Sequence, residues 1–399
     1  MRRRSTVRAV RARLTAVALA AAVVLALAPS ASAKPGMEVA VQDDFVFVTQ
    51  GYYKRSSAFS RIAQFRAKWL RVNVSWNAVN GSQARSRSKP RKVRYDWTAY
   101  DSLINASRAA GVNLQLTLTG PAPAWATGNK KVGPYKPNVT HFKAFVREAV
   151  RHFAPFVDRY SIWNEPNLAP WLAPLSAAPK MYRSLYARAY SEIKKADPSA
   201  QVLIGETSPY ATKGRSIAPV SFIAQVLKYG ALKADGYAHH PYDLTHKPDY
   251  KYPGSKNATL GTLNNLVREL DRQAASGRLR TPGGAALDVW LTEYGYLRAG
   301  RHKVSEGTRA AYLKQAYDMA LANPRVRQIL QYLLVQPGSK YAFFDMSLLN
   351  RSGKPFGAAF QGLVDWSNTH AGQINGNVPG GGGGSGGGGS RPGYKDPFS

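Results

Sequence analysis

The sequence contains no cysteine among its 399 residues, so structural disulfides and thiolate metal sites are excluded. Its seven histidines show no metal-ligand spacing beyond the adjacent pair His239 and His240, and we therefore expect neither a metal ion nor any other cofactor. After residue 33, no segment is long and apolar enough to span a bilayer. Any chemistry is therefore expected to come from ordinary polar side chains.

Acidic residues are scarce, because 23 aspartates and glutamates stand against 55 lysines and arginines, a formal net charge of +32. The excess either gives a solvated, self-repelling surface or attracts polyanions such as an acidic glycan, an anionic cell-wall polymer or nucleic acid. No nucleic-acid-binding motif accompanies the charge, so specific nucleic-acid binding is not expected. The densest cluster consists of Arg85, Arg87, Lys89, Arg91, Lys92 and Arg94.

Both ends of the chain differ in composition from its middle. Residues 1–33 combine an arginine-rich start, a short apolar run and the small-residue cleavage site ASA, which predicts a cleaved signal peptide and a secreted, extracellular protein. A membrane anchor is the alternative, but the apolar run is short for a span. Cleavage would leave 49 basic and 23 acidic residues, a net charge of +26, and would end membrane contact. Residues 371–399 contain a Gly/Ser run and are expected to form a flexible linker and tail.

Between these ends, short β-rich runs alternate with segments of helical periodicity. The strand candidates are residues 39–48, 68–76, 112–118, 159–163, 201–205, 234–240, 287–293 and 327–335. Eight strands that alternate with helices predict a single (β/α)8 TIM barrel of the α/β class over residues 37–370. A doubly wound open sheet is less favoured, because no glycine-rich phosphate turn follows the first strand.

Two glutamates stand at predicted strand ends. Glu165, within WNEPN, follows the fourth strand, and Glu293, within WLTEYGY, ends the seventh. The carboxyl ends of barrel strands carry the active site, and these two strands lie on opposite sides of the barrel, so the carboxylates can face each other. Glycosidic cleavage requires such a pair, because one group protonates the leaving oxygen while the other attacks the anomeric carbon. The alternative is that each glutamate merely binds an amine or the backbone.

The motifs WNEPN and LTEYG resemble those of the clan A retaining glycoside hydrolases with (β/α)8 barrels, above all families 5 and 39. FRAKWLRVNVSW is similar to the second strand of these families, GPAPAW to their third loop, and SLLNRSGKPFGAAFQGL to their closing segment. The resemblance covers roughly residues 40–366. It implies an O-glycosyl hydrolase that acts by double displacement, with Glu165 as acid/base and Glu293 as nucleophile.

The same resemblance implies roles for neighbours of the glutamates. Asn164 would hydrogen-bond the sugar 2-hydroxyl, and Arg71 would contact the nucleophile. His240 and Tyr242 match a His-x-Tyr pattern of the sixth strand, in which the tyrosine orients the nucleophile.

Two features depart from the family 5 pattern. Gly120 and Pro121 stand where those enzymes usually carry a histidine, and Gln336 is the candidate for their strand-eight tryptophan. These departures favour a family 39-like or unclassified relative and leave the substrate open.

Aromatic residues after several strand ends are candidates to pack against the C–H faces of a sugar, although each of them also suits ordinary core packing. They are Trp76, Trp125, Trp171, Tyr210 and Tyr296. Glu206 follows the fifth strand and is expected to have a structural role. His239 is expected to be a packed neighbour of His240.

The sequence therefore predicts a secreted, monomeric retaining glycosidase that hydrolyses O-glycosidic bonds, expected to be β-linked, in an oligo- or polysaccharide. The alternative is a catalytically silent barrel that binds a glycan or an anionic cell-wall polymer, and the presence of both glutamates favours the enzyme. The basic cluster follows the second strand, so its loop is expected on the catalytic face, where it is either solvated or attracts an anionic polymer. The sugar, the linkage, endo or exo action, hydrolysis or transglycosylation, and the export route stay open.

Overall fold

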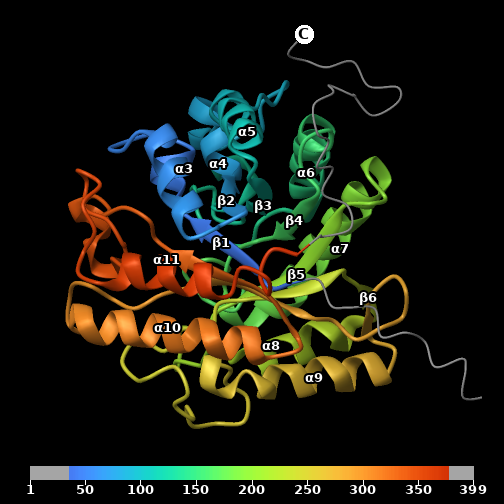
Figure 1. Ribbon diagram of the computed structural model, residues 1–399. Coiled ribbons are helices and arrows are strands. Elements are labelled where there is room, and N and C mark those ends of the chain that lie inside the picture. Colours follow the sequence, from blue (N-terminus) through green and yellow to red (C-terminus); the bar gives the residue numbers. More distant parts are fainter. Residues whose placement is uncertain (1–35, 377–399) are drawn as a thin grey trace, which may run out of the picture. The chain divides into compact units, whose positions relative to one another are not determined.

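The computed structural model describes residues 36–376, and the predicted signal peptide and residues 377–399 of the predicted tail lie outside this range. Within it, eight parallel strands close into a barrel in the order β1-β10-β9-β7-β5-β4-β3-β2, and helices surround them (Figure 1). These strands are β1 (Glu38–Gln42), β2 (Trp69–Ser75), β3 (Asn113–Thr119), β4 (Arg159–Ile162), β5 (Gln201–Thr207), β7 (Gly236–His239), β9 (Val289–Tyr294) and β10 (Val326–Tyr332). The predicted (β/α)8 fold is confirmed.

The segments between the strands are largely helical. The α-helices of the described range are α2 (Asp44–Phe47), α3 (Arg55–Gln64), α4 (Trp76–Val79), α5 (Thr98–Ala110), α6 (Val139–Phe153), α7 (Ala178–Ala196), α8 (Pro219–Val226), α9 (Asn264–Ala275), α10 (Glu306–Ala322) and α11 (Ala359–Thr369). Short 3-10 turns are η2 (Gly81–Arg85), η3 (Ala124–Ala126), η4 (Leu175–Ala177), η5 (Leu227–Tyr229), η6 (Leu260–Thr262) and η7 (Ser339–Phe344). A separate two-stranded sheet pairs β6 (Leu232–Lys233) with β8 (Leu279–Arg280).

The first predicted strand, 39–48, is too long, because β1 ends at Gln42 and helix α2 begins at Asp44. The backbone carbonyl of Asp43 accepts hydrogen bonds from the amides of Val46 (3.1 Å) and Phe47 (2.9 Å), which turns the chain into the helix. The apolar run 39–48 thus contains both a strand and one helical turn. Its composition alone does not show where the strand ends and the helix begins.

Side chains alternate along the strands between an apolar outer layer and a polar barrel interior. In β2, Leu70, Val72 and Val74 pack against the surrounding helices, whereas Arg71 lies in the barrel interior and its Nε donates to Thr117 Oγ1 of the neighbouring strand β3 at 2.9 Å. The period of two therefore buries both faces of each strand, and polar groups in the interior hydrogen-bond to one another.

The surrounding helices cover the outer layer with apolar stripes. Helix α6 begins at the N-cap Asn138, whose side chain accepts a hydrogen bond from the amide of His141, and it buries the predicted stripe. That stripe consists of Phe142, Phe145, Val146, Ala149, Val150 and Phe153. Each buried phenylalanine contributes about 1.5–3 kcal/mol by leaving water, so this stripe fixes α6 to the barrel.

At the amino ends of the strands, the barrel is closed by a buried ion pair. Arg159 of β4 donates to both carboxylate oxygens of Glu38 of β1, at 2.6 and 2.7 Å. Its guanidinium also lies 3.6 Å from the ring centroid of Trp69. The charge is thus paired, hydrogen-bonded and stacked, as a fully buried arginine requires.

The packed domain continues past the predicted boundary at residue 370. Ile374 forms a bridge to Met37 and is buried, and the side chain of Asn375 accepts a hydrogen bond from the amide of Val39 at 3.0 Å. Residues 371–376 therefore belong to the barrel domain and not to the tail.

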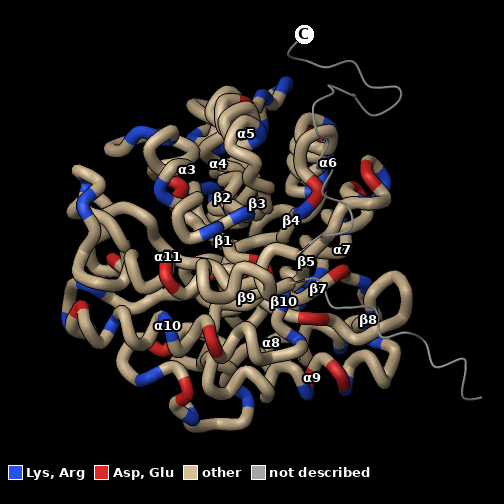
Figure 2. The backbone as a smooth tube through the Cα atoms, in the orientation of Figure 1, with Lys and Arg blue, Asp and Glu red and all other residues tan. Residues whose placement is uncertain are grey.

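The basic residues are spread over the outer helices and loops of the barrel (Figure 2). No helix among residues 36–376 has the length and apolar character needed to cross a membrane.

Candidate active site

Glu165 and Glu293 lie together at the carboxyl end of the barrel. Glu165 stands three residues after the end of β4, and its backbone amide donates to the carbonyl of Glu206 at 2.9 Å, which ties this turn to β5. Glu293 lies near the end of β9. The side chains retain 17% and 9% exposure, respectively, so both carboxylates are accessible from the barrel mouth while most of their surroundings are protein.

His240, directly after β7, joins the two glutamates. Its Nδ1 lies 3.1 Å from Glu165 Oε1 and 3.6 Å from Glu293 Oε2, so these two oxygens are at most about 6.7 Å apart. Burial disfavours the charged ring, but the negative charge of Glu293 and hydrogen bonds with Glu165 and Glu206 outweigh it and raise the pKa of His240 to about 9. At neutral pH the imidazolium therefore donates from both of its nitrogens.

Glu293 is held through both of its oxygens. Arg71 Nη1 donates to Oε1 at 2.6 Å, and the hydroxyl of Tyr242 donates to Oε2 at 3.0 Å. Burial and the charge of Glu293 raise the pKa of Tyr242 well above its ordinary value, so the phenol stays a donor. Arg71 Nη2 also donates to Asn164 Oδ1 at 2.7 Å. The four neighbours of the glutamates predicted from the sequence thus belong to one hydrogen-bond network: Asn164, Arg71, His240 and Tyr242.

Glu206 lies beneath these groups and is fully buried. Arg71 Nε donates to its Oε1 at 3.2 Å, and His240 Nε2 and Thr292 Oγ1 donate to its Oε2 at 2.8 and 2.6 Å. Burial opposes ionisation, yet the charges of Arg71 and His240 and the hydrogen bonds outweigh it and lower the pKa of Glu206 to about 2. Glu206 thus balances the charges of Arg71 and His240, the two buried cations that contact Glu165 and Glu293. The expected structural role agrees with this placement.

Unusual backbone conformations orient Glu165 and Glu206. Trp163, Glu165 and Glu206 have φ values of 65°, 38° and 49°, in the left-handed region that costs non-glycine residues about 1–3 kcal/mol each. Next to Glu206, Gly205 marks a register shift between β5 and β7, and a Cβ there would lie 2.5 Å from the carbonyl of Ala238. The bulge lets Glu206 turn into the barrel. Strain of this kind concentrates where geometry serves function.

Gly120, a departure from the family 5 pattern, has a local reason. A Cβ on this residue would lie 2.8 Å from the ring of Trp163, two residues before Glu165. A larger side chain such as histidine does not fit beside this indole.

Two of the aromatic residues predicted to bind a sugar are buried in the core. Trp76 is fully buried and stacks on Phe145, and Tyr296 is fully buried and donates its hydroxyl to the carbonyl of His246 at 2.8 Å. Neither ring has a surface to offer a sugar, so their prediction as binding residues is wrong. Trp125 lines a different pocket, beside α6. Trp171 is half-buried after β4 and remains a candidate.

Residue Gln336 is not the strand-eight residue of the site, because β10 ends at Tyr332. Tyr332 lies close enough to Glu293 for its charge, together with burial, to raise the pKa of the phenol. Its ring packs with Phe344 at 5.8 Å, and Phe344 packs edge-on with Tyr242 at 5.6 Å. This aromatic wall was missed because the expected motif is a tryptophan.

His239 is buried beside the site and hydrogen-bonds Thr207 Oγ1 at 2.9 Å and the carbonyl of Ala258 at 2.6 Å, as expected for a packed neighbour. Residues 36–376 hold no group of three or more His, Asp or Glu side chains arranged to hold a metal ion.

Comparison with known proteins finds likeness in structure. No protein-family model matches the chain, and no curated protein matches its sequence. A family 39 glycoside hydrolase from Bacteroides cellulosilyticus WH2 aligns with a TM-score of 0.63 and 20% identity over 84% of this chain and 64% of that chain. The fold is that of these glycoside hydrolases.

Two further structures support the same fold. A monomeric β-xylosidase from Caulobacter crescentus CB15 aligns with a TM-score of 0.57 and 18% identity over 83% of this chain and 68% of its own. A GH5_18 protein from Bifidobacterium longum subsp. infantis aligns with a TM-score of 0.57 and 12% identity over 84% of this chain and 79% of its own. The chain thus spans 64% of the family 39 structure.

Proposed function

We propose that this protein is a secreted retaining glycosidase that hydrolyses O-glycosidic bonds, expected to be β-linked, with Glu165 as acid/base and Glu293 as nucleophile. The observation that carries the proposal is the pair of mouth-facing carboxylates that share His240 Nδ1 and lie at most about 6.7 Å apart. The upper bound of about 6.7 Å includes the separation of about 5–5.5 Å found in retaining enzymes and excludes all but the lower edge of the range of about 6.5–9.5 Å that inverting enzymes need for a water molecule.

The surroundings of the two glutamates support different roles. Both oxygens of Glu293 are fixed by Arg71 and Tyr242, which suits a carboxylate that must attack one carbon from one direction. Glu165 is more exposed and has His240 as its hydrogen-bond partner among residues 36–376, which suits a group that exchanges protons with the leaving oxygen and with water.

In the first step, Glu293 attacks the anomeric carbon as the proton of Glu165 passes to the leaving oxygen, and a glycosyl ester forms. In the second step, Glu165 takes a proton from water, the resulting hydroxide attacks the anomeric carbon, and Glu293 leaves as the carboxylate. The imidazolium of His240 lies between the two carboxyl groups and faces the charge of Glu293 before the first step and the charge of Glu165 before the second.

Secretion is proposed from the signal-like residues 1–33, and the substrate class from the fold neighbours. Because one of those neighbours is a β-xylosidase, a screen of aryl glycosides begins with aryl β-xylosides and continues to other β-glycosides and to polysaccharides, with product analysis.

The test uses two variants and one control. Glu293→Ala is expected to abolish turnover, and azide is expected to restore it with inverted anomeric configuration. Glu165→Ala is expected to spare substrates with good leaving groups, which need no proton. Asp365→Asn, at an exposed aspartate of α11, is the control and is expected to leave kcat/KM unchanged. Normal activity of both active-site variants on a true substrate would overturn the assignment.

A catalytically silent barrel that binds a glycan or an anionic polymer remains the second candidate, favoured by the net charge of +32. It predicts binding of a polysaccharide without release of reducing ends on any substrate of the screen.

A further inference from the structure

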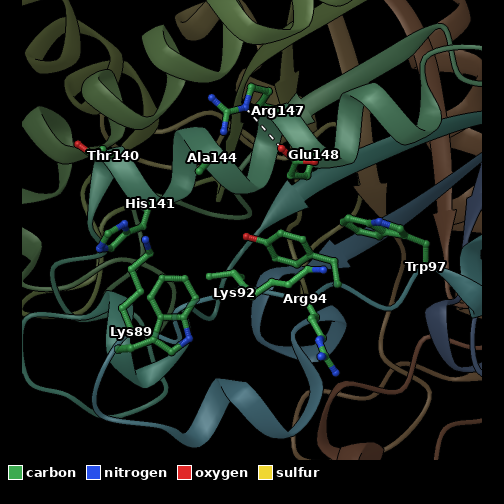
Figure 3. Close-up of a pocket in the computed structure, with 12 residues that line it drawn as sticks. Lys89, Lys92, Arg94, Trp97, Thr140, His141, Ala144, Arg147 and Glu148 are labelled. Carbon is green, nitrogen blue, oxygen red and sulfur yellow. Dashed lines mark ion pairs between the residues drawn. The ribbon is translucent and has the colours of Figure 1, made fainter.

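A second hollow lies on the flank of the barrel, between helix α6 and the loop of residues 86–97 that follows η2. It has a volume of about 730 Å³. Ala144 and Arg147 of α6 line one side, and Lys89, Lys92 and Arg94 of the loop line the other, as Figure 3 shows. Half of the basic cluster at residues 85–94 therefore borders this pocket and not the two glutamates.

The pocket has a strong excess of positive charge. Its single carboxylate, Glu148, lies 3.5 Å from both Arg147 Nε and Arg151 Nη1, so it is already shared between two arginines. Within residues 36–376 no ion pair involves the side chain of Lys89, Lys92 or Arg94. Three cations without a carboxylate thus surround one hollow, within the reach of about 8 Å that physiological salt allows.

The positive charges also change the pKa of His141, a histidine of the pocket lining. Burial and the positive charges of Lys89 and Lys130 lower the pKa of His141, which lines the pocket. The ring is therefore neutral near pH 7 and offers a hydrogen-bonding group beside the cations.

Aromatic rings form the rest of the lining. Tyr95 stacks on Trp97 with ring centroids 5.4 Å apart, and Trp97 lies 6.3 Å from Phe145 of α6. Trp125 is fixed by a hydrogen bond from its Nε1 to Asn80 Oδ1 at 3.0 Å. Tyr95 and Trp97 are half-buried and held by packing before any ligand arrives, so they present preorganised apolar surface beside the cations, whereas Trp125 is buried behind them.

The pocket is separate from the glutamate pair. Trp125 contacts Trp76 at 5.8 Å, Trp76 contacts Phe142 at 5.6 Å, and Phe142 contacts Trp163 at 5.4 Å between ring centroids. Trp76, Phe142 and Trp163 are fully buried, and they fill the space between the pocket and the turn that carries Glu165.

We propose that this pocket binds a polysaccharide whose sugar units carry carboxylates, at a site distinct from the two glutamates. Lys89, Lys92 and Arg94 supply the partners for carboxylates, and the rings supply flat surfaces for the C–H faces of the sugar. The choice of a saccharide over a nucleic acid rests on the proposed function, because the cationic loop leaves the carboxyl end of β2, the same barrel face as the catalytic mouth. The binding of an anionic polymer does not depend on that function.

The test is calorimetric titration with a short galacturonate oligomer and with its methyl ester, which keeps the backbone but removes the charges. The pocket variant carries Lys89→Gln, Lys92→Gln and Arg94→Gln. Its matched control carries Arg85→Gln, Arg87→Gln and Arg91→Gln, which removes the same charge from the same basic cluster outside the pocket lining. The pocket variant is expected to bind the acidic oligomer roughly tenfold more weakly than the control does at low salt.

The wild-type protein is expected to bind the methyl ester weakly, and the advantage of the acidic oligomer is expected to shrink at about 0.15 M salt. Equal weakening in both triple variants would assign the effect to overall charge and overturn the proposal, as would equal binding of the methyl ester. Tighter binding of a single-stranded oligonucleotide, lost in the pocket variant, would assign the site to nucleic acid instead.

All replaced residues are exposed, and unchanged thermal midpoints verify the folding of both variants. If the pocket triple variant unfolds early, Lys92→Gln compared with Arg91→Gln gives the same contrast. The titration needs no turnover, so it tests binding at the pocket even if the protein is not a glycosidase. Likewise, the aryl-glycoside test of activity still holds if the pocket does not bind the acidic oligomer.

Discussion

Replacing Glu206 by glutamine removes the buried negative charge beneath Glu165 and Glu293 while nearly conserving the volume of the side chain. Four donors point at this carboxylate: Arg71 Nε at 3.2 Å, Gln115 Nε2 at 3.3 Å, His240 Nε2 at 2.8 Å and Thr292 Oγ1 at 2.6 Å. A glutamine has one acceptor oxygen and an NH2 group that would face some of these donors. Two buried cations would also lose their shared counter-charge.

The expected cost follows from two independent arguments. A folded-state pKa of about 2 against an ordinary 4.5 corresponds to roughly 3 kcal/mol of stability at neutral pH. Removal of one partner from a buried ion pair costs about 3–5 kcal/mol in other proteins. The variant is therefore expected to be about 3–5 kcal/mol less stable near pH 7.

Urea unfolding of the wild type, Glu206→Gln and the exposed control Glu148→Gln measures the difference, with unchanged m values as the check that the transitions are comparable. The control is expected to change stability by less than about 1 kcal/mol. Because the folded pKa of Glu206 is lowered, its contribution is present above about pH 4.5 and is lost as pH falls toward about 2. The gap between wild type and Glu206→Gln is therefore expected to narrow below about pH 5.

A loss below about 1 kcal/mol for Glu206→Gln, or a gap that stays constant down to pH 4, would refute the view that this carboxylate is ionised and holds the two cations. A loss as large in the Glu148→Gln control would show that the measurement reports overall charge instead.

Three further predictions concern the same framework. The pKa of His240 is raised from 6.5 to about 9, so its positive charge contributes up to roughly 3 kcal/mol of stability. This contribution is complete below about pH 6.5 and is lost as pH rises through about 9. Urea unfolding of His240→Gln is expected to lack this decline. Arg159→Met should destabilise the fold by about 3–5 kcal/mol because it leaves Glu38 buried and unpaired, and the added change Glu38→Leu should recover much of the loss; no recovery in the double variant would contradict the ion-pair argument. Tyr242→Phe should lower kcat/KM on aryl glycosides by about tenfold or more with unchanged thermal stability, since it removes the hydroxyl bound to Glu293; unaltered kinetics would show that the contact has no role in orientation.

The sequence by itself determined the architecture and the central pair. Alternation with a period of two placed apolar residues toward the helices, and the stripe of α6 followed its own 3.6-residue period, so strands and helices could be assigned from neighbouring residues. Once eight such strands alternate with helices, Glu165 and Glu293 must reach the same rim. The first strand was misjudged because Asp43 and Asp44 interrupt an apolar run that one helical turn fits as well as a strand.

Only the tertiary structure decided which groups surround that pair. Arg71 contacts Glu206 and Glu293, which are 135 and 222 residues away in the sequence, and the bulge at Gly205 turns Glu206 into the barrel. The buried network therefore forms because the barrel closes, and it cannot be predicted from neighbouring residues in the sequence. Trp76 was predicted to bind sugar but is enclosed by α6, because an aromatic residue after a strand has the same local sequence whether a helix covers it or not. Half of the basic cluster likewise lines the pocket beside α6 and not the site of the two glutamates. Periodicity is set by residues a few positions apart, whereas burial and charge pairing depend on which distant elements pack together.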